Sequence, residues 1–386
     1  MDRDRTQPRE TLIDSPEEKR LRALIEKRTD PEGLRLKKFL AMPDLSRTDG
    51  SPIRELVRRI VELPDFKAFD VVRVPEVVPA RESFDLFNFP SDHPARSRSD
   101  TYYVSDDHIL RTHTTIMWYY HLGRDEVKRR IAQGEPVGLL SYGKVYRKDE
   151  IDRKHMNVFH QMDGLYICRR EEKKIGSEDL KEILVKIAQA VYGTDIQYRF
   201  NKDTFPYTDP SLEMEIEVRG RWVEVLGSGV VRAKVLDNLG VDSKIYNGWA
   251  FGFGLERLAI LSMDLPDIRL LWSDDPRVKR QLKLGSAYRE VSKYPPITRD
   301  ISFVVDAGFA PNDYFDLIRD AGGDLVEEVS LLDKYENREK FGPGKISYTY
   351  RIIYRSNERT LLAQEAAAIQ EKVIEDTKKQ FHAEIR

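Results

Sequence analysis

A run of alternating residues near the C-terminus constrains the fold more strongly than any other feature of this chain. Ile346, Tyr348, Tyr350, Ile352 and Tyr354 occupy every second position, which is the period at which a strand presents one face to a core. The elements expected around it are a strand over 301–305, a helix over 314–322, a strand over 325–335 and a helix over 366–381. This β-α-β-β-α order, closed by a short edge strand near 383–386, predicts a ferredoxin-like fold.

The rest of the chain is too long to share that fold. With 386 residues the sequence exceeds the size at which one core keeps growing, so we expect two domains and an appendage. A charged, leucine-punctuated pattern predicts a helical appendage within residues 1–50. Residues 51–284 mix a strand-like run over 223–231 with helical patterns over 180–192 and 254–263, which indicates an α+β domain. Residues 285–386 form the ferredoxin-like unit, and 285–296 are the expected hinge.

Composition excludes several classes of protein. Cys168 is the single cysteine, so the chain can build neither a disulfide framework nor a thiolate zinc site. No apolar run has the length of a membrane span, and six acids among the first twenty residues do not fit a secretory or transit peptide. We therefore expect a cytoplasmic protein, or alternatively one of the mitochondrial matrix whose transit peptide is absent from this chain. The net charge of −2 neither favours nor excludes RNA.

The most informative stretch for chemistry is GKVYRKDEIDRKHMNVFHQMDGLYI, residues 143–167. It predicts two strands joined by a charged loop. Arg147 leaves the first strand and offers a guanidinium for bidentate phosphate contact. His155, Phe159, Gln161 and Asp163 then supply a second basic group, an aromatic plate and two polar side chains that can hold an ammonium group. The alternative interpretation is an ordinary solvated hairpin, but that does not require all of these groups in this order.

A second stretch, GWAFGFGLERLAIL at 248–261, predicts a strand of small residues that runs into a helix near Gly254. Glycines allow a ligand to approach the backbone closely, and Arg257 on the first turn of the helix can project over that ligand. The alternative is tight packing of a helix on a sheet. Alone, this stretch does not decide between the two.

These two stretches resemble motifs 2 and 3 of the class II aminoacyl-tRNA synthetases, and the segments around them resemble the phenylalanyl-tRNA synthetase family. The similar segments are 87–104 (FNFPSDHPARSRSDTYYV), 111–115 (RTHTT), 159–164 (FHQMDG), 205–211 (FPYTDPS), 224–229 (EVLGSG) and 266–272 (PDIRLLW). The C-terminal segments 292–305, 322–335 and 359–361 are similar to the family's anticodon-binding domain. Both parts on one chain resemble the monomeric, organellar-type enzyme.

The resemblance implies a phenylalanine–tRNA ligase with a class II antiparallel-sheet domain, which forms phenylalanyl-adenylate from L-phenylalanine and ATP and then charges tRNA(Phe). Arg147 and Arg257 would be the catalytic residues. Arg147 would bind the α-phosphate, and Arg257 would cover the adenine and the distal phosphate. The other residues implied for ATP are Asp149, Lys154, His155, Met156, Phe159, Glu224 and Gly254. Glu224, and second Asp209, would hold Mg²⁺, although either acid could instead make a surface salt bridge.

For the amino acid, the resemblance implies a pocket drawn from several segments. His113 and Thr115 would lie beside its carboxylate and amino group, and Gln161 with Asp163 would hold the ammonium. The residues implied around the ring and backbone are Phe205, Tyr207, Gly227, Ala250, Phe251 and Gly252. An aromatic pair at the spacing of Phe205 and Tyr207 is otherwise typical of a strand packed in a core.

The tRNA partner is assigned to the C-terminal domain by resemblance, because residues 285–386 carry 15 Lys plus Arg against 18 Asp plus Glu. Arg351, Arg355 and Arg359 are the expected contacts, while Tyr348, Tyr350 and Tyr354 can simply form core. We expect a monomer without membrane association.

The sequence departs from the family pattern at three places. Asp163 stands where the family usually has Glu, Tyr207 stands where it has Phe, and Ile116–Trp118 stand where it expects a Gln. Two other functions fit the same fold: a synthetase-derived RNA-binding protein without catalysis, and a class II enzyme for a different amino acid. The presence of Arg147, Arg257 and Glu224 argues against the first, and the aromatic FPYTDPS segment argues for an aromatic substrate.

Overall fold

The computed structural model describes residues 10–291, 294–356 and 358–386, which form two compact units. The first unit consists of the described residues up to Tyr146, Val158–Leu265 and Leu282–Ala287. The second consists of Arg147–Asn157, Pro266–Gln281 and the described residues from Tyr288 onward. Part of the acidic N-terminus (1–9) and part of the expected hinge (292–293) lie outside the described residues.

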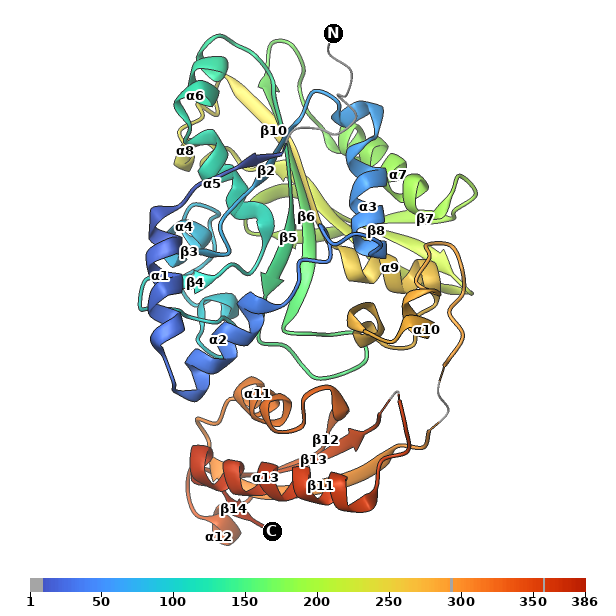
Figure 1. Ribbon diagram of the computed structural model, residues 1–386. Coiled ribbons are helices and arrows are strands. Elements are labelled where there is room, and N and C mark those ends of the chain that lie inside the picture. Colours follow the sequence, from blue (N-terminus) through green and yellow to red (C-terminus); the bar gives the residue numbers. More distant parts are fainter. Residues whose placement is uncertain (1–9, 292–293, 357) are drawn as a thin grey trace. The chain divides into compact units, whose positions relative to one another are not determined.

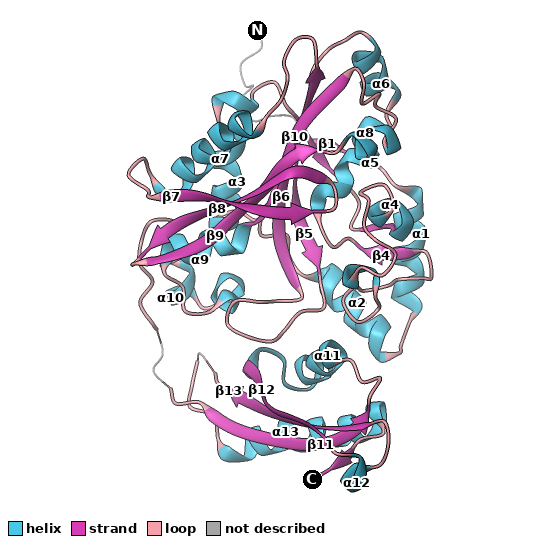
Figure 2. Ribbon diagram, turned by 180° about the vertical axis from the view of Figure 1, so that it is seen from behind, coloured by secondary structure: helices cyan, strands magenta, loops and turns pink. Residues whose placement is uncertain are grey.

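An eight-stranded sheet organises the first unit, in the order β1-β2-β5-β6-β10-β9-β8-β7 (Figures 1 and 2). The strands are β1 (Thr11–Leu12), β2 (Asp70–Arg73), β5 (Val137–Tyr146), β6 (Val158–Arg169), β7 (Tyr198–Phe205), β8 (Thr208–Val218), β9 (Arg221–Val231) and β10 (Tyr246–Gly254). Neighbours from β5 to β7 are all antiparallel, whereas β1 and β2 join in parallel. A largely antiparallel sheet of this kind is what the resemblance to the class II synthetases implies.

Three helices pack together over one face of this sheet: α3 (Pro52–Val61), α7 (Ser177–Tyr192) and α9 (Leu255–Met263) (Figure 1). Each has an apolar stripe at helical spacing that is buried, for example Leu180, Leu184 and Ile187 of α7. Pro52 occupies the first turn of α3, where its missing N–H costs nothing, and the Ser51 side chain caps the helix.

The opposite face of the sheet contributes Leu165, Ile167 and Ala250 to a second apolar core that includes Trp118. The remaining elements of this unit are α1 (Pro16–Lys27), α2 (Pro31–Ala41), β3 (Val77–Pro79), α4 (Ala80–Phe84), β4 (His108–Leu110), α5 (Met117–Leu122), α6 (Asp125–Ala132) and α8 (Ala233–Asn238). Pro31 begins α2, with Asp30 capping it, so the break in the N-terminal helical pattern separates two helices.

The second unit contains the ferredoxin-like fold that the alternating run predicts. Its elements are α10 (Pro276–Lys279), β11 (Ile297–Asp306), α11 (Pro311–Gly322), β12 (Val326–Glu336), α12 (Arg338–Phe341), β13 (Lys345–Tyr354), α13 (Ala363–Phe381) and β14 (Glu384–Ile385). The sheet order is β12-β13-β11-β14. Tyr348, Tyr350 and Tyr354 are buried in its core, which confirms that this face of β13 packs against helices.

No helix within the described parts of the chain combines the length and apolarity that a membrane crossing requires.

Candidate active site

Asp163 lies at the centre of the predicted amino-acid-binding residues. It is buried on β6, and Thr115 Oγ1 donates a hydrogen bond of 2.6 Å to its Oδ1 atom. Thr114 donates to the other carboxylate oxygen. Thr114 was not among the predicted residues, although the hydroxyl pair in the RTHTT segment is a visible signal. Two hydroxyl donors to the charged oxygens stabilise the ionised, correctly oriented carboxylate.

Glycines line the space next to this carboxylate. A Cβ atom on Gly252 would lie 2.7 Å from Asp163 Oδ1 and 3.4 Å from Gln161 Nε2. On the neighbouring strand Gly227 pairs with Gly252 in register, and a Cβ atom on Gly227 would lie 3.0 Å from the Phe205 ring. Side chains at the two glycine positions would therefore fill the space between the carboxylate and the ring.

A set of aromatic rings continues from Phe205. The Tyr207 ring stacks on Phe205 with centroids 5.9 Å apart, and it meets Trp118 edge-on at 6.2 Å. Phe89 contacts Tyr207 at 6.2 Å and stacks on His113 at 6.0 Å. The predicted residues His113, Phe205 and Tyr207 therefore belong to one aromatic wall. Sequence reasoning missed Phe89, although the Phe-x-Phe spacing of Phe87 and Phe89 is readable in the sequence.

The departure from the family pattern at Ile116–Trp118 is accommodated by the packing of Trp118. Its side chain is 1% exposed and packs edge-on against Phe87 and Tyr207. Its Nε1 donor has no hydrogen-bond partner within the described residues. This indole is therefore part of the apolar backing of the aromatic wall.

Ala250 and Phe251 lie on opposite faces of the sheet, because neighbouring residues of a strand alternate. Ala250 belongs to the core cluster behind the aromatic wall. Phe251 instead covers Gly164 and contacts Phe66, which follows α3. The structure thus brings Ala250, but not Phe251, to the side of Asp163 and Gly252.

Arg257 and Glu224, two of the predicted ATP-binding residues, are neighbours. Arg257 Nη1 lies 3.5 Å from Glu224 Oε2 and donates to the Glu224 carbonyl at 3.4 Å. Both side chains are about half exposed, 49% and 48%. Gly254 ends β10 immediately before α9, and no atom lies within 4 Å of a Cβ built there. A ligand can therefore approach the start of this helix.

The acidic residues predicted for a metal ion are not close together. Asp209 is next to Thr208, which pairs with Val231 at the end of β9, and it forms an ion pair with Arg232 at 3.3 Å. Glu224 lies near the start of β9, directly opposite Glu215. Within the described residues no group of three or more His, Cys, Asp or Glu is arranged to hold a metal. Mg²⁺ is usually held by one or two carboxylates together with substrate phosphates, and the opposed Glu215 and Glu224 fit that requirement.

The loop predicted to hold ATP phosphates packs within the second unit. There Lys148 Nζ lies 2.7 Å from Asp313 Oδ1, and Arg319 donates to the backbone carbonyl of Asp149 at 3.2 Å. His155 Nδ1 lies 2.9 Å from Asp152 Oδ1, and this hydrogen bond raises the pKa of His155. The side chain of Lys154 is exposed, and those of Arg147 and Met156 are half-buried.

The three arginines predicted to bind tRNA all form ion pairs in the second unit. Arg351 makes two 2.8 Å hydrogen bonds to Asp300, Arg355 lies 2.7 Å from Glu327, and Arg359 donates to Glu365 at 2.6 Å. Sequence reasoning missed a different surface at the end of β12. Leu331, Leu332 and Tyr335 are exposed there by 49%, 46% and 46%.

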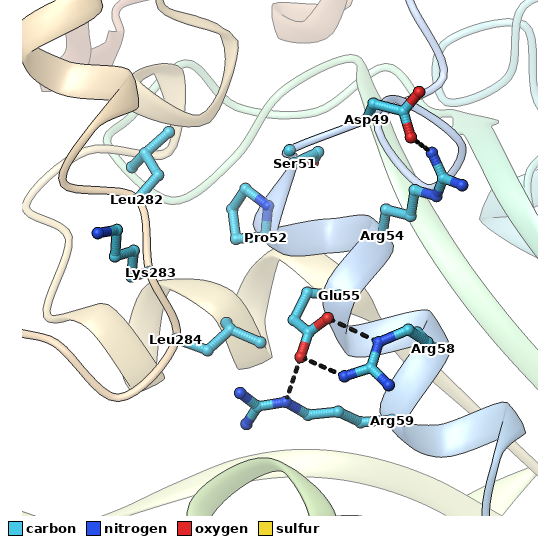
Figure 3. A pocket seen from close by; sticks show the side chains of 11 residues that line it. Asp49, Ser51, Pro52, Arg54, Glu55, Arg58, Arg59, Leu282, Lys283 and Leu284 are labelled. Atoms are coloured by element: carbon cyan, nitrogen blue, oxygen red, sulfur yellow. Dashed lines mark hydrogen bonds and ion pairs between the residues drawn. The ribbon is translucent and has the colours of Figure 1, made fainter.

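A surface pocket of about 460 Å³ lies elsewhere in the first unit, at the start of α3 (Figure 3). None of the predicted site residues lines it. Glu55 binds Arg58 at 2.8 Å and Arg59 at 2.9 Å, while Arg54 pairs with Asp49. These pairs occupy the charged lining, so we do not place the active site here.

Comparison with known families decides between the readings of the sequence. Residues 39–282 match the class II core domain of tRNA synthetases, and residues 292–386 match the ferredoxin-fold anticodon-binding domain. The chain is 34% identical over 330 residues to a probable mitochondrial phenylalanine–tRNA ligase of Drosophila melanogaster, covering 69% of this chain and 72% of the relative. It belongs to the phenylalanine–tRNA ligases of class II. Members of this family use ATP.

Two further relatives support this family. The chloroplastic/mitochondrial phenylalanine–tRNA ligase of Arabidopsis thaliana is 40% identical over 258 residues, 64% of this chain. The mitochondrial enzyme of Mus musculus is 37% identical over 273 residues, 61% of this chain. The chain spans 59% of the length of each of these two relatives.

The names of these relatives correct one expectation. The cytoplasmic location inferred from the acidic N-terminus is wrong, because the plant, mouse and fly relatives are all named as mitochondrial or chloroplastic enzymes. They point to an organelle rather than the cytoplasm.

Proposed function

We propose that this protein activates L-phenylalanine with ATP and transfers it to the 3′ end of tRNA(Phe). The observation that carries the proposal is the group formed by Asp163, Thr115, Gly252 and the Phe205–Tyr207 wall. A fixed carboxylate suits an ammonium group, and aromatic rings suit a phenyl side chain. The glycines leave room between the two.

Arg147 and Arg257 are the proposed catalytic residues. Each would stabilise phosphate charge that develops while the amino-acid carboxylate attacks the α-phosphate of ATP in line. For the other ATP contacts we propose Phe159 as the adenine stack, with Asp149, Lys154, His155 and Met156 from the loop and Gly254 at the start of α9. The supporting observation for Arg257 is its half-exposed guanidinium beside an open helix start.

For Mg²⁺ we propose Glu224, with Glu215 opposite it as the second carboxylate rather than Asp209. The ion would neutralise the triphosphate when bound. Arg199 and Asn201 contact Glu215, and Arg257 pairs with Glu224. These partners offset the repulsion between the two carboxylates.

We propose that the C-terminal domain binds tRNA. Its contacts would be Arg351, Arg355 and Arg359, together with the exposed end of β12. The exposed Tyr335 ring meets Phe341 edge-on with centroids 6.1 Å apart. Lys340 and Arg386 lie over the Phe341 ring at 5.6 and 5.1 Å, so cations flank this aromatic pair. Unpaired RNA bases are recognised by stacking on aromatic rings flanked by cations.

The functional division we propose is an appendage over 1–50, a catalytic domain over 51–284 and an anticodon-binding domain over 285–386. We also propose that the enzyme works as a monomer. The outward face of α3 carries the ion pairs around Glu55 shown in Figure 3, and such charged faces are unusual in the cores of obligate dimer interfaces.

Aminoacylation of a tRNA(Phe) transcript with labelled phenylalanine tests the proposed function. We expect charging that requires ATP and tRNA(Phe), with tRNA(Tyr) as the control transcript. If the protein forms the adenylate but charges no tRNA, its function is limited to amino-acid activation. Failure of both reactions would contradict the proposed function.

A further inference from the structure

His160 lies on β6 between two residues assigned to substrates, Phe159 and Gln161. Because strand residues alternate, its side chain points away from them, to the face that α9 covers. The imidazole is fully buried, with 0% exposure. A buried polar ring needs hydrogen-bond partners on both nitrogens.

The ring has such partners on both sides. Nδ1 lies 2.6 Å from Glu256 Oε1, and the backbone N–H of Leu45 donates to Nε2 at 2.9 Å. Nδ1 donates to the Glu256 carboxylate, which can only accept, and Nε2 also lies 3.3 Å from Asp44 Oδ1. The backbone N–H of His160 also donates to both Glu256 oxygens, at 2.9 and 2.8 Å.

Glu256 belongs to the first turn of α9 and is the residue immediately before Arg257. Its carboxylate is 2% exposed and is held by the side chain and the backbone of His160. This contact fixes the rotation of the first helical turn against β6. Arg257, by contrast, is half exposed and bonded only weakly, at 3.4 and 3.5 Å, to Glu224. The direction in which the Arg257 side chain leaves the helix is therefore set by the backbone that Glu256 holds in place.

We propose that His160 is a positioning residue, which acts through Glu256 to aim Arg257 at ATP. This role depends on the ATP-binding function proposed above for Arg257. It also means that the Leu45 segment, which supplies the second partner of the ring, supports the active site from behind the sheet.

The test is a double-mutant cycle on ATP-dependent pyrophosphate exchange. In His160→Gln the new amide reaches the place of Nε2 but not that of Nδ1, so the bond to Glu256 is lost and the Leu45 contact is kept. We expect kcat/KM for ATP to fall about tenfold, the usual effect of losing a hydrogen bond to a charged group. In an Arg257→Ala background the same change should have less than a twofold effect, because the residue it positions is gone.

Two further variants control this result. In His160→Asn the amide takes the place of Nδ1, so it should restore most of the ATP kinetics. His121 is another buried histidine of this unit, 3.0 Å from Asp70, and His121→Gln should lower the melting temperature without changing the KM for ATP. If His160→Gln does not fold, Glu256→Gln replaces it in the same cycle.

Independent, multiplicative effects of His160→Gln and Arg257→Ala would overturn the positioning role, as would equal defects in His160→Asn and His160→Gln. Absence of phenylalanine-dependent exchange in the wild-type enzyme would instead contradict the proposed function. The two failures are thus distinguishable.

Discussion

Thr115 Oγ1 donates a 2.6 Å hydrogen bond to Asp163 Oδ1, and this pair fixes the orientation of the carboxylate assigned to the ammonium group of the substrate. Replacing Thr115 by Val should raise the KM for phenylalanine about tenfold, because a hydrogen bond to a charged group is lost, while the KM for ATP stays within twofold. Steady-state pyrophosphate exchange measures both constants.

Thr377 offers a matched control for that variant. Its hydroxyl is also buried and donates to the carbonyl of Val373 in α13. Thr377→Val should leave both Michaelis constants unchanged. If Thr115→Val raised the two constants equally, Asp163 would not be specific to the amino acid.

Arg257→Ala and Arg147→Ala should each lower phenylalanine-dependent pyrophosphate exchange by at least about a hundredfold, the usual cost of losing one preorganised charge partner. Arg219 pairs with Asp264 at 2.6 Å on the surface of the first unit, and Arg219→Ala should retain normal exchange. Near wild-type exchange in Arg257→Ala or Arg147→Ala would show that the arginine replaced in that variant is not catalytic.

Tyr335→Ala should raise the apparent KM for tRNA(Phe) about tenfold or more, because a base stacked on an aromatic ring contributes about 1–3 kcal/mol. Pyrophosphate exchange, which needs no tRNA, should not change. Tyr198 is 42% exposed on β7, so Tyr198→Ala is the control. Unaltered charging kinetics in Tyr335→Ala would show that the exposed end of β12 does not touch the tRNA.

Asp44 should make stability depend on acidity. Burial raises the pKa of its carboxyl, but His160, Arg47 and Ser46 outweigh this effect and hold the pKa below its usual range. A carboxyl whose folded pKa is depressed stabilises the protein fully above its unfolded pKa of about 3.9, and this contribution is lost as the pH falls toward the folded pKa.

Urea unfolding at pH 7 and pH 3 measures this contribution. Asp44→Asn should lower the free energy of unfolding at pH 7 by more than about 1 kcal/mol and reduce its loss at pH 3. The same pH dependence in the variant and the wild type would mean that Asp44 is not responsible.

The elements of the C-terminal domain could be predicted because their signal is local. Alternation in 346–354 identifies a strand with one buried face, and the structure buries Tyr348, Tyr350 and Tyr354. The pairing order of the strands follows from the β-α-β-β-α-β connection once the elements are known. The class II sheet was identified in a different way, from motifs that resemble a family.

Details of the site depended on information that the sequence does not carry. Alternation along a strand predicts that Ala250 and Phe251 face opposite sides, but only the register with β6 shows that Ala250 shares the side of Asp163. Nor does spacing show that Glu215, rather than Asp209, lies opposite Glu224, because a bulge next to Glu215 shifts the register of β8 and β9. The ion partners of Arg351 and Arg355 come from strands far away in sequence.

Pyrophosphate exchange measured with each of the twenty amino acids tests the central claim most directly. With phenylalanine the enzyme should exchange labelled pyrophosphate into ATP, with tyrosine as a much poorer substrate and the other amino acids near background. Exchange that favours a different amino acid would contradict the assignment of the Asp163 and Tyr207 pocket to phenylalanine. Absence of exchange with all twenty amino acids would contradict the claim that the protein activates an amino acid.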